Sequence, residues 1–229
     1  MQLSLSAAEL KNYVARQTEF FFPDGYHMAG TDVDAAFRTA LDRLEVCLDS
    51  ICQPGYHNER GECVFSHLHA DQYAQFLYYF GNTLWLQSGN RVLCDKLLQL
   101  NRVLHNIFIS YKCGLPDHFF LGHPFGTILG NASYHDFLVV MQGVTVNTER
   151  DEQNNPAPVL GKGLFLGAHA KIIGNKSIGD RVSLGVDSFV YQREVPDDSV
   201  VINDGHDSCI IRPRKKPQCK AQEYFNLPI

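Results

Sequence analysis

The stretch LGAHAKIIGNKSIGDRVSLG, residues 166–185, places an aliphatic residue at every sixth position, and the interval continues on both sides of it. The full series is Leu160, Leu166, Ile172, Ile178, Leu184 and Val190. An α-helix repeats about every 3.6 residues and a strand every two, so neither explains an interval of six. Six residues suit one side of a triangular coil, which points one side chain per face into a narrow axial core.

Two further features favour the triangular coil over a run of ordinary short strands joined by loops. Glycine follows four of the first five inward residues, as a corner requires where the backbone needs unusual dihedral angles or close approach. A second series lies four positions after the inward residues and would fill the next layer: Leu164, Ala170, Val182 and Ser188, with Lys176 as the exception. Ordinary strands and loops would not require so exact a period.

Composition excludes several classes of function. At 229 residues and 45% hydrophobic content, the chain can form one large domain or two small ones. A net charge of −5 gives no overall attraction to nucleic acid, and the basic cluster 212–216 (RPRKK) is short. No apolar run reaches the length of a membrane span, and residues 1–13 lack the features of a signal peptide. We therefore expect a cytoplasmic protein with no nucleic-acid partner and no membrane span.

The cysteines and histidines do not form a metal-binding pattern. The seven cysteines contain no C-x-x-C pair, so free thiols in a reducing compartment are expected. His67 and His69 form an H-x-H, but no cysteine or carboxylate cluster accompanies them at the spacing of metal ligands. We predict no metal site.

Residues 1–107 have helical spacing. Ser6 with Glu9, and Thr31 with Asp34, match the capping-box pattern, and each pair is expected to open a helix. Apolar residues then recur at intervals of three and four, as buried helical faces require, in the stretches 33–51, 73–84 and 93–107. These patterns predict an α-helical domain of four helices.

The spacing changes near residue 107. Glycine-punctuated aliphatic residues continue to about residue 203, which predicts a second domain at 108–203. The polar, proline-bearing residues 147–158 (NTERDEQNNPAP) should leave the coil as an excursion loop. Residues 204–229 are expected to form a C-terminal tail, with a strand at 209–212 (CIIR).

Two segments of the second domain carry a resemblance to a known family. They are LGHPFGTILGNASYHDFLVVMQGVTVN (121–147) and LGKGLFLGAHAKIIGNKSIGDRVSLGVDSFV (160–190), and they resemble the left-handed β-helix of hexapeptide-repeat acyltransferases. Within that superfamily the chain looks like serine O-acetyltransferase, in which a helical domain also precedes the β-helix. The resemblance implies an α+β fold, with an N-terminal helical domain followed by a left-handed parallel β-helix.

The resemblance also implies an activity, the transfer of an acetyl group from acetyl-CoA as co-substrate to a hydroxyl. The family's sites lie at clefts between subunits, so a homotrimer or a dimer of trimers is expected. A hydroxyl is a poor nucleophile at neutral pH, and an imidazole is suited to remove its proton during attack on the thioester. His123, in LGHP, aligns with the family's catalytic histidine and is expected to be the general base. The alternative is a structural histidine that only forms hydrogen bonds.

Departures from the family pattern leave the acceptor open. Where the family has an aspartate directly before this histidine, this chain has Gly122. The position of a second family aspartate, about fifteen residues upstream, falls on Phe108 or its neighbours. The family's Arg-His-Pro aligns with residues 154–158 (NNPAP), which contain no arginine or histidine. In the family those groups hold the charged ends of the amino acid and assist the histidine. The acceptor is therefore expected to be L-serine or a sugar or polysaccharide precursor.

Other residues are candidates for assisting the base or binding the acceptor. His135 and Asp136, about two repeats downstream of the base, are expected to lie beside it in the stacked coils, and His118 is a further candidate. Asn154 and Asn155 in the excursion loop are candidates for hydrogen bonds to a neutral sugar hydroxyl. The alternative for each is an ordinary surface or coil-edge residue.

By the same resemblance, the coenzyme would lie along a glycine-rich edge made by Gly167, Ala168, Gly185 and Val186. Small residues there would let the pantetheine arm approach the backbone, although corners of the fold require small residues too. Lys171, Lys176 and the run 212–216 are candidates for binding the phosphates of CoA, and His169 for facing the same groove.

Two other functions stay open. A β-helix that has lost catalysis would be a scaffold or partner-binding protein, a reading that the presence of His123 disfavours. The last four residues, 226–229 (NLPI), resemble the partner-docking end of serine acetyltransferases and predict a partner enzyme bound through the C-terminal tail.

Overall fold

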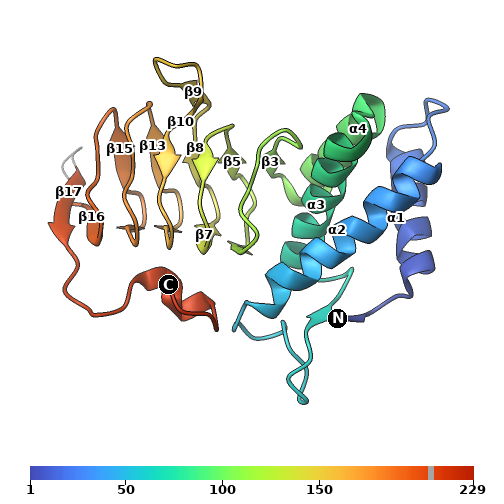
Figure 1. The fold of residues 1–229 in the computed structure, drawn as a ribbon, viewed down its shortest axis with the longest axis horizontal. Helices are drawn as coiled ribbons and strands as arrows, with labels where there is room; N and C mark the ends of the chain where they lie inside the picture. Colours follow the sequence, from blue (N-terminus) through green and yellow to red (C-terminus); the bar gives the residue numbers. More distant parts are fainter. Residues whose placement is uncertain (206–208) are drawn as a thin grey trace.

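The computed structural model describes residues 1–205 and 209–229, and it places a group of helices beside a stack of short strands (Figure 1). Four α-helices come first: α1 Ala7–Phe21, α2 Thr31–Asp49, α3 Ala70–Ser88 and α4 Arg91–His105. A short parallel pair, β1 (Gln2–Leu3) and β2 (Val64–Phe65), ties the N-terminus to the connection between α2 and α3. The predicted group of four helices is therefore confirmed. None of the helices in the described ranges is long and apolar enough to cross a membrane.

The two predicted helix caps have different outcomes. Ser6 is the N-cap of α1, and both bonds of the capping box with Glu9 are present. The predicted cap at Thr31 is wrong, because α2 already includes Thr31 and its N-cap is Gly30. Gly30 has φ +121°, a conformation that glycine adopts without steric cost, so the chain turns into the helix there without a side-chain cap.

Helix α3 is the central helix, and it also fastens the helical domain to the first coil. It contacts α2, α4 and β4 (Phe119–Gly122), and its apolar stripe is buried as the spacing predicts. Buried polar side chains of α3 reach the coil: Gln75 donates to the carbonyl of Phe119 at 2.9 Å, and Asn82 donates to that of Tyr111 at 2.8 Å. A buried carbonyl without a partner is costly, so these bonds fix how α3 docks on the coil.

The strands form three faces, as a triangular coil requires, and apart from β17 the strands within each face run parallel (Figure 1). One face has the order β17-β16-β14-β12-β7-β4, with β7 Leu138–Met141, β12 Phe165–Leu166, β14 Ser183–Leu184, β16 Ser199–Asn203 and β17 Cys209–Pro213. The second contains β3 Phe108–Ile109, β5 Ile128–Leu129, β8 Thr145–Val146, β13 Lys171–Ile173 and β15 Phe189–Tyr191. The third pairs β6 (Ser133–Tyr134) with β11 (Val159–Leu160) and continues through bridges to Ile178 and Val195.

The hexapeptide series fills the interior of this coil. Every inward residue from Leu160 to Val190 is at most 4% exposed. The second series is also buried, whereas Lys176 is exposed, as its polarity predicts. Burial of each aliphatic side chain contributes about 1.5–3 kcal/mol, so a core one side chain wide can hold the coil together. The β-helix predicted from the six-residue period is confirmed.

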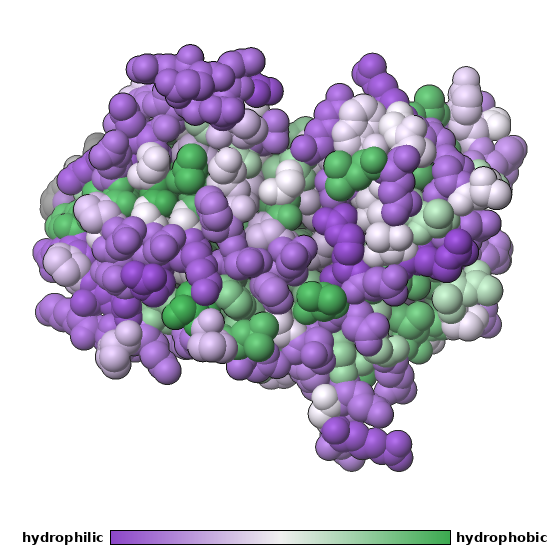
Figure 2. Space-filling model, viewed as in Figure 1, coloured by the Kyte–Doolittle hydropathy of each residue, from purple (hydrophilic) through white to green (hydrophobic). Residues whose placement is uncertain are grey.

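The predicted excursion at 147–158 is a hairpin that leaves the stack (Figure 1). Its strands are β9 (Glu149–Arg150) and β10 (Pro156–Ala157), which pair antiparallel. The hairpin rises above the coil and its surface is hydrophilic (Figure 2). Asp151 holds the turn by accepting hydrogen bonds from Asn155, 2.8 Å from its backbone nitrogen and 3.0 Å from Nδ2.

Residues 209–229 fold back along the coil. The strand predicted at 209–212 is present within β17, which pairs antiparallel with β16. A 3-10 helix, η1 (Lys220–Tyr224), follows and brings the chain back toward α2, where Phe225 is buried and bridges to Ile51. The guanidinium of Arg214 forms an ion pair with Asp198, which anchors the returning segment to the last coil.

Candidate active site

His123 lies at the corner that ends β4. Strand β4 (FFLG) is fully buried, and the chain turns sharply at His123, whose φ is +48°. The side chain of His123 is 78% exposed although the strand before it is buried. A non-glycine residue in the left-handed region costs conformational free energy, so this corner presents the imidazole at the expense of local strain.

A carboxylate from the helical domain reaches His123. Asp71, in the first turn of α3, is buried with 8% of its side chain exposed. Its Oδ2 accepts a hydrogen bond from the backbone N–H of His123 at 3.0 Å and lies 3.5 Å from Nδ1 of the ring. A negative charge in the first turn of a helix is favoured by the helix dipole. The site therefore has a histidine–carboxylate pair whose members come from different domains.

The position of Asp71 indicates which ring nitrogen of His123 is free to accept a proton. A carboxylate beside Nδ1 favours the tautomer with its proton on Nδ1, an assignment inferred from the 3.5 Å between that nitrogen and Oδ2 of Asp71. Nε2 is then unprotonated, on a ring whose side chain is largely exposed. Such a nitrogen can accept a proton from a hydroxyl placed against it.

Sequence reasoning missed Asp71, which lies 52 residues before His123. The sequence did contain a signal for Asp71, because it is the one charged residue in the otherwise uncharged stretch of α3. At Gly122, where the family carries aspartate, a Cβ would lie 2.8 Å from Sδ of Met141 and 3.0 Å from Cε1 of Phe120. The carboxylate of this site thus comes from α3, while the position before the histidine is crowded by neighbouring side chains.

A cavity of about 320 Å³ opens beside this pair, at the junction of α3, α4 and the corner after β4. Its lining residues are Ala70, Asp71, Leu104, His105, His123, Pro124 and Phe125. It is large enough for a small molecule and is mostly apolar apart from two imidazoles and one carboxylate. His105 was not singled out by sequence reasoning.

The predicted assisting residues lie at the opposite edge of the same sheet. His118 and Asp136 precede β4 and β7, and Nδ1 of His118 is 3.2 Å from Oδ1 of Asp136. His123 follows β4, so the length of a four-residue strand, about 13 Å, separates the two edges. The ring of His135 is engaged with the carbonyl of Leu160 at 2.8 Å. The structure brings none of the three to His123.

The predicted loop residues form the turn of the hairpin. Asn154 has φ +67°, and Asn155 hydrogen-bonds to Asp151 within the turn. Arg150, which the alignment of 154–158 passed over, lies in the same hairpin and donates to the carbonyl of Asn154 at 2.6 Å. The loop therefore carries a guanidinium close in sequence to the position where the family has one.

The predicted coenzyme residues follow the same sheet edge as His123. Gly167 and Gly185 directly follow β12 and β14, and the order β4-β7-β12-β14 separates them from the histidine by two and three strand spacings. Three spacings amount to about 14 Å. A Cβ on Gly167 would lie 2.8 Å from the carbonyl oxygen of Leu184, so close stacking of the coils itself requires glycine there. Ala168 and Val186 come next at this edge, and Val186 is 62% exposed.

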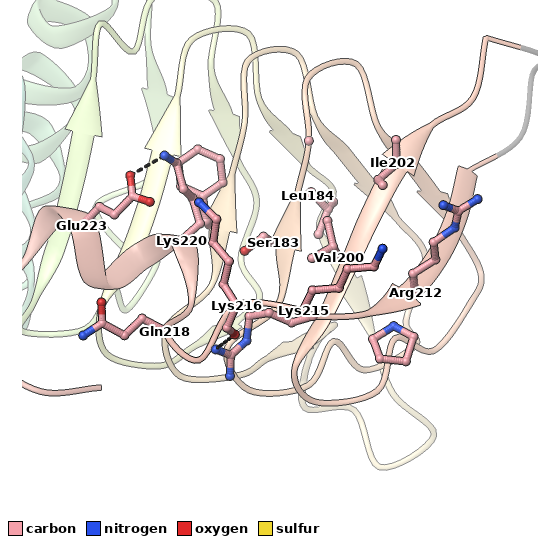
Figure 3. Close-up of a pocket in the computed structure, with 14 residues that line it drawn as sticks. Ser183, Leu184, Val200, Ile202, Arg212, Lys215, Lys216, Gln218, Lys220 and Glu223 are labelled. Carbon is pink, nitrogen blue, oxygen red and sulfur yellow. Dashed lines mark hydrogen bonds and ion pairs between the residues drawn. The ribbon is translucent and has the colours of Figure 1, made fainter.

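A second cavity, of about 480 Å³, lies between the outer face of this sheet and the returning C-terminal segment. Figure 3 shows Val200 and Ile202 on its floor and basic side chains from the returning segment around it: Arg212, Lys215, Lys216 and Lys220. Gly185 is also part of the lining. The predicted basic run thus meets the predicted coenzyme edge, and we call this cavity the cationic groove.

Three other predicted side chains lie outside the cationic groove. Lys171 is on β13 of the neighbouring face, and Lys176 lies in the following turn. His169 packs against Gly143, where a Cβ would meet its Nδ1 at 2.5 Å. Among the described residues, no group of three or more histidine, cysteine, aspartate or glutamate side chains is placed to hold a metal ion. At the terminus, the backbone N–H of Ile229 donates to Oε1 of Gln222 at 3.0 Å, so the NLPI segment is folded onto its own chain.

Known proteins resemble the chain in sequence and in fold. No protein-family model matches the chain. It is 32% identical over 120 residues to serine acetyltransferase from Synechococcus elongatus, covering 52% of this chain and 49% of the relative. It is 29% identical over 146 residues to serine acetyltransferase from Staphylococcus epidermidis, covering 62% and 67%. The match to the first relative thus spans about half of that protein's length.

The fold similarity extends over more of the chain than the sequence similarity. The crystal structure of serine acetyltransferase from Neisseria gonorrhoeae superimposes with a TM-score of 0.68 at 19% identity, covering 94% of this chain and 82% of that one. At this identity the superposition concerns the fold. The chain is thus similar to serine acetyltransferases, distantly in sequence over about half of its length or somewhat more, and in fold over nearly its whole length.

Proposed function

We propose that this protein is an acetyltransferase that moves an acetyl group from acetyl-CoA to a hydroxyl of a small acceptor, with His123 as general base. The observation that carries the proposal is the His123–Asp71 pair at the mouth of a cavity, with Nε2 of the histidine available. An exposed imidazole held by a buried carboxylate is the arrangement that activates a hydroxyl in acyl transfer.

The proposed reaction uses the His123–Asp71 pair in the following way. The acceptor hydroxyl lies in the cavity, and its oxygen attacks the thioester carbonyl as its proton passes to Nε2 of His123. The tetrahedral intermediate collapses, the carbon–sulfur bond breaks, and the CoA sulfur takes the proton from His123. The products are the acetyl ester and CoA, and the histidine returns to its starting state. Asp71 keeps the ring oriented and stabilises the transient imidazolium.

Acetyl-CoA would lie along the edge formed by Gly167, Ala168, Gly185 and Val186, with its thioester toward His123. The cationic groove at the far end of that edge would hold the phosphates of the nucleotide. Exposed apolar side chains on the same part of the coil, Val186, Phe189 and Tyr191, support a second copy of the chain covering this edge, as in a homotrimer.

We expect the double substitution Lys215→Gln with Lys216→Gln to raise the KM for acetyl-CoA about tenfold, because each exposed ion pair contributes up to about 1 kcal/mol. The increase should vanish with acetyl-dephospho-CoA, which lacks the 3′-phosphate. Lys112→Gln, in the connection between β3 and β4, is the matched control and should leave both KM values unchanged. Equal increases for the two coenzymes would contradict a contact with the 3′-phosphate.

The experiment that tests the function itself measures acetyl-CoA binding and CoA release with L-serine and with a panel of sugars and nucleotide sugars. Acceptor-dependent CoA release with formation of an acetyl ester supports the proposal. Binding of acetyl-CoA without ester formation on any of these acceptors contradicts it and favours a catalytically inactive β-helix that serves as a scaffold or partner-binding protein.

A further inference from the structure

His105 is the second imidazole of the acceptor cavity, and its protonation state follows from its surroundings. It is the last residue of α4, and burial lowers its pKa to about 4. Nδ1 of His105 lies 2.7 Å from Oδ1 of Asn101. The amide nitrogen of Asn101 donates to the carbonyl of Ala74 at 3.0 Å, which identifies the other amide atom as oxygen. Since that oxygen only accepts, Nδ1 of His105 carries the proton.

The neutral ring therefore has a bare Nε2, which can only accept a hydrogen bond. The cavity that His105 lines also has apolar walls, to which Leu104, Pro124 and Phe125 contribute. A ligand that brings a hydroxyl to this nitrogen forms a hydrogen bond that an apolar ligand cannot form. His105 thus differs from His123, whose Nδ1 faces a carboxylate and whose ring is exposed.

The charges of the cavity bear on the class of acceptor. The one carboxylate of the lining, Asp71, is already engaged by His123, and the described lining residues include no lysine or arginine. A ligand carboxylate in this cavity would face the negative charge of Asp71 without a cation from the lining to balance it. An uncharged hydroxyl meets no such repulsion.

We propose that this cavity is the acceptor site and that it takes an uncharged polyol, such as a sugar, one hydroxyl of which reacts at His123 while a second donates to Nε2 of His105. This inference rests on the proposed acetyl transfer and adds to it a substrate class and a specificity-determining residue. The cavity of about 320 Å³ has room for a single sugar ring.

A matched series of small acceptors tests the class. Glycerol and methyl glucoside are neutral, D-glycerate adds a carboxylate to the glycerol skeleton, 2-amino-1,3-propanediol adds an amine, and L-serine carries both charges. We expect kcat/KM to be at least tenfold higher for glycerol than for glycerate, and higher for methyl glucoside than for L-serine. A preference for L-serine that is lost in Arg150→Gln would overturn the proposal, because the loop guanidinium would then hold the carboxylate.

Variants of His105 test the residue. His105→Phe keeps a ring of similar shape but removes the acceptor nitrogen, so the KM for the polyol should rise about tenfold while the KM for acetyl-CoA stays unchanged. His105→Gln restores a hydrogen-bond acceptor and should recover part of the loss. An unchanged polyol KM in a folded His105→Phe protein would refute the assignment. As a readout without turnover, the ¹⁵N chemical shift of Nε2 should move when methyl glucoside is added to the wild-type protein.

Acetyl transfer and the polyol site can be contradicted separately. If L-serine is the preferred acceptor and His123 is required, the result supports acetyl transfer and contradicts the polyol site. If acetyl-CoA binds but no acceptor in the series is acetylated, both the transfer and the polyol site are contradicted.

Discussion

Replacing His123 by asparagine is expected to lower kcat for acetyl transfer by about 10²- to 10⁴-fold and to leave the affinity for acetyl-CoA unchanged. Removal of the imidazole takes away the group that accepts the hydroxyl proton during attack. Asparagine is the sharper replacement than alanine, because it tolerates the left-handed backbone conformation that this corner requires, at φ +48°. The measurement is single-turnover ester formation together with equilibrium binding of acetyl-CoA.

Two observations separate a catalytic loss from a structural one. The melting temperature of His123→Asn should stay close to that of the wild type, since the side chain is 78% exposed. His27→Asn, which removes an exposed imidazole from the helical domain, is the control and should keep full activity. Retention of transfer within threefold of the wild type in His123→Asn would exclude the histidine as general base.

The fold could be read from the sequence because its determinants are local and periodic. The interval of six from Leu160 to Val190 reflects the geometry of one coil, and each inward residue meets the same environment. The four helices follow from apolar spacing in the same way. The cap at Thr31 failed because Gly30 makes the same entry through backbone conformation, without the side-chain bond that the pattern implies.

The candidate site was harder to predict from the sequence than the fold, because it joins segments that are far apart along the chain. His123 could be found by its resemblance to a motif, but Asp71 meets it only because α3 docks on β4 through bonds such as Gln75 to Phe119. The expectation for His135 and Asp136 counted repeats along the axis and did not include the position of each residue around the coil. Asp136 precedes a strand of the sheet whose other edge carries His123, so their stacking does not bring them together.

Docking of α3 also bears on why the helical domain is needed. The carboxylate, His105 and the apolar walls made by Ala70 and Leu104 all come from helices, whereas His123, Pro124 and Phe125 come from the coil. A β-helix without its helical domain would retain the histidine and lose both its partner and half of the cavity. The proposed catalysis therefore depends on the docking of the helices on the first coil.

The second large effect is expected at Asp71, a positioning residue that acts through His123. Asp71→Asn keeps the size of the side chain, and its amide oxygen can still accept the backbone N–H of His123, so the fold should hold. The negative charge beside Nδ1 is lost, and with it the preference for the productive tautomer. We expect kcat to fall about 10²-fold, the cost of a misplaced catalytic group, with the KM for acetyl-CoA unchanged.

Asp71→Glu restores the charge one methylene further along and should regain part of the lost kcat, which a purely structural role would not predict. Asp136→Asn is the matched control, because it removes a carboxylate from a histidine pair of similar geometry at the opposite edge of the same sheet. Its kcat should stay at the wild-type value. Equal losses in Asp71→Asn and Asp136→Asn would mean that both carboxylates act through the stability of the coil, and the role of Asp71 in orienting His123 would have to be abandoned.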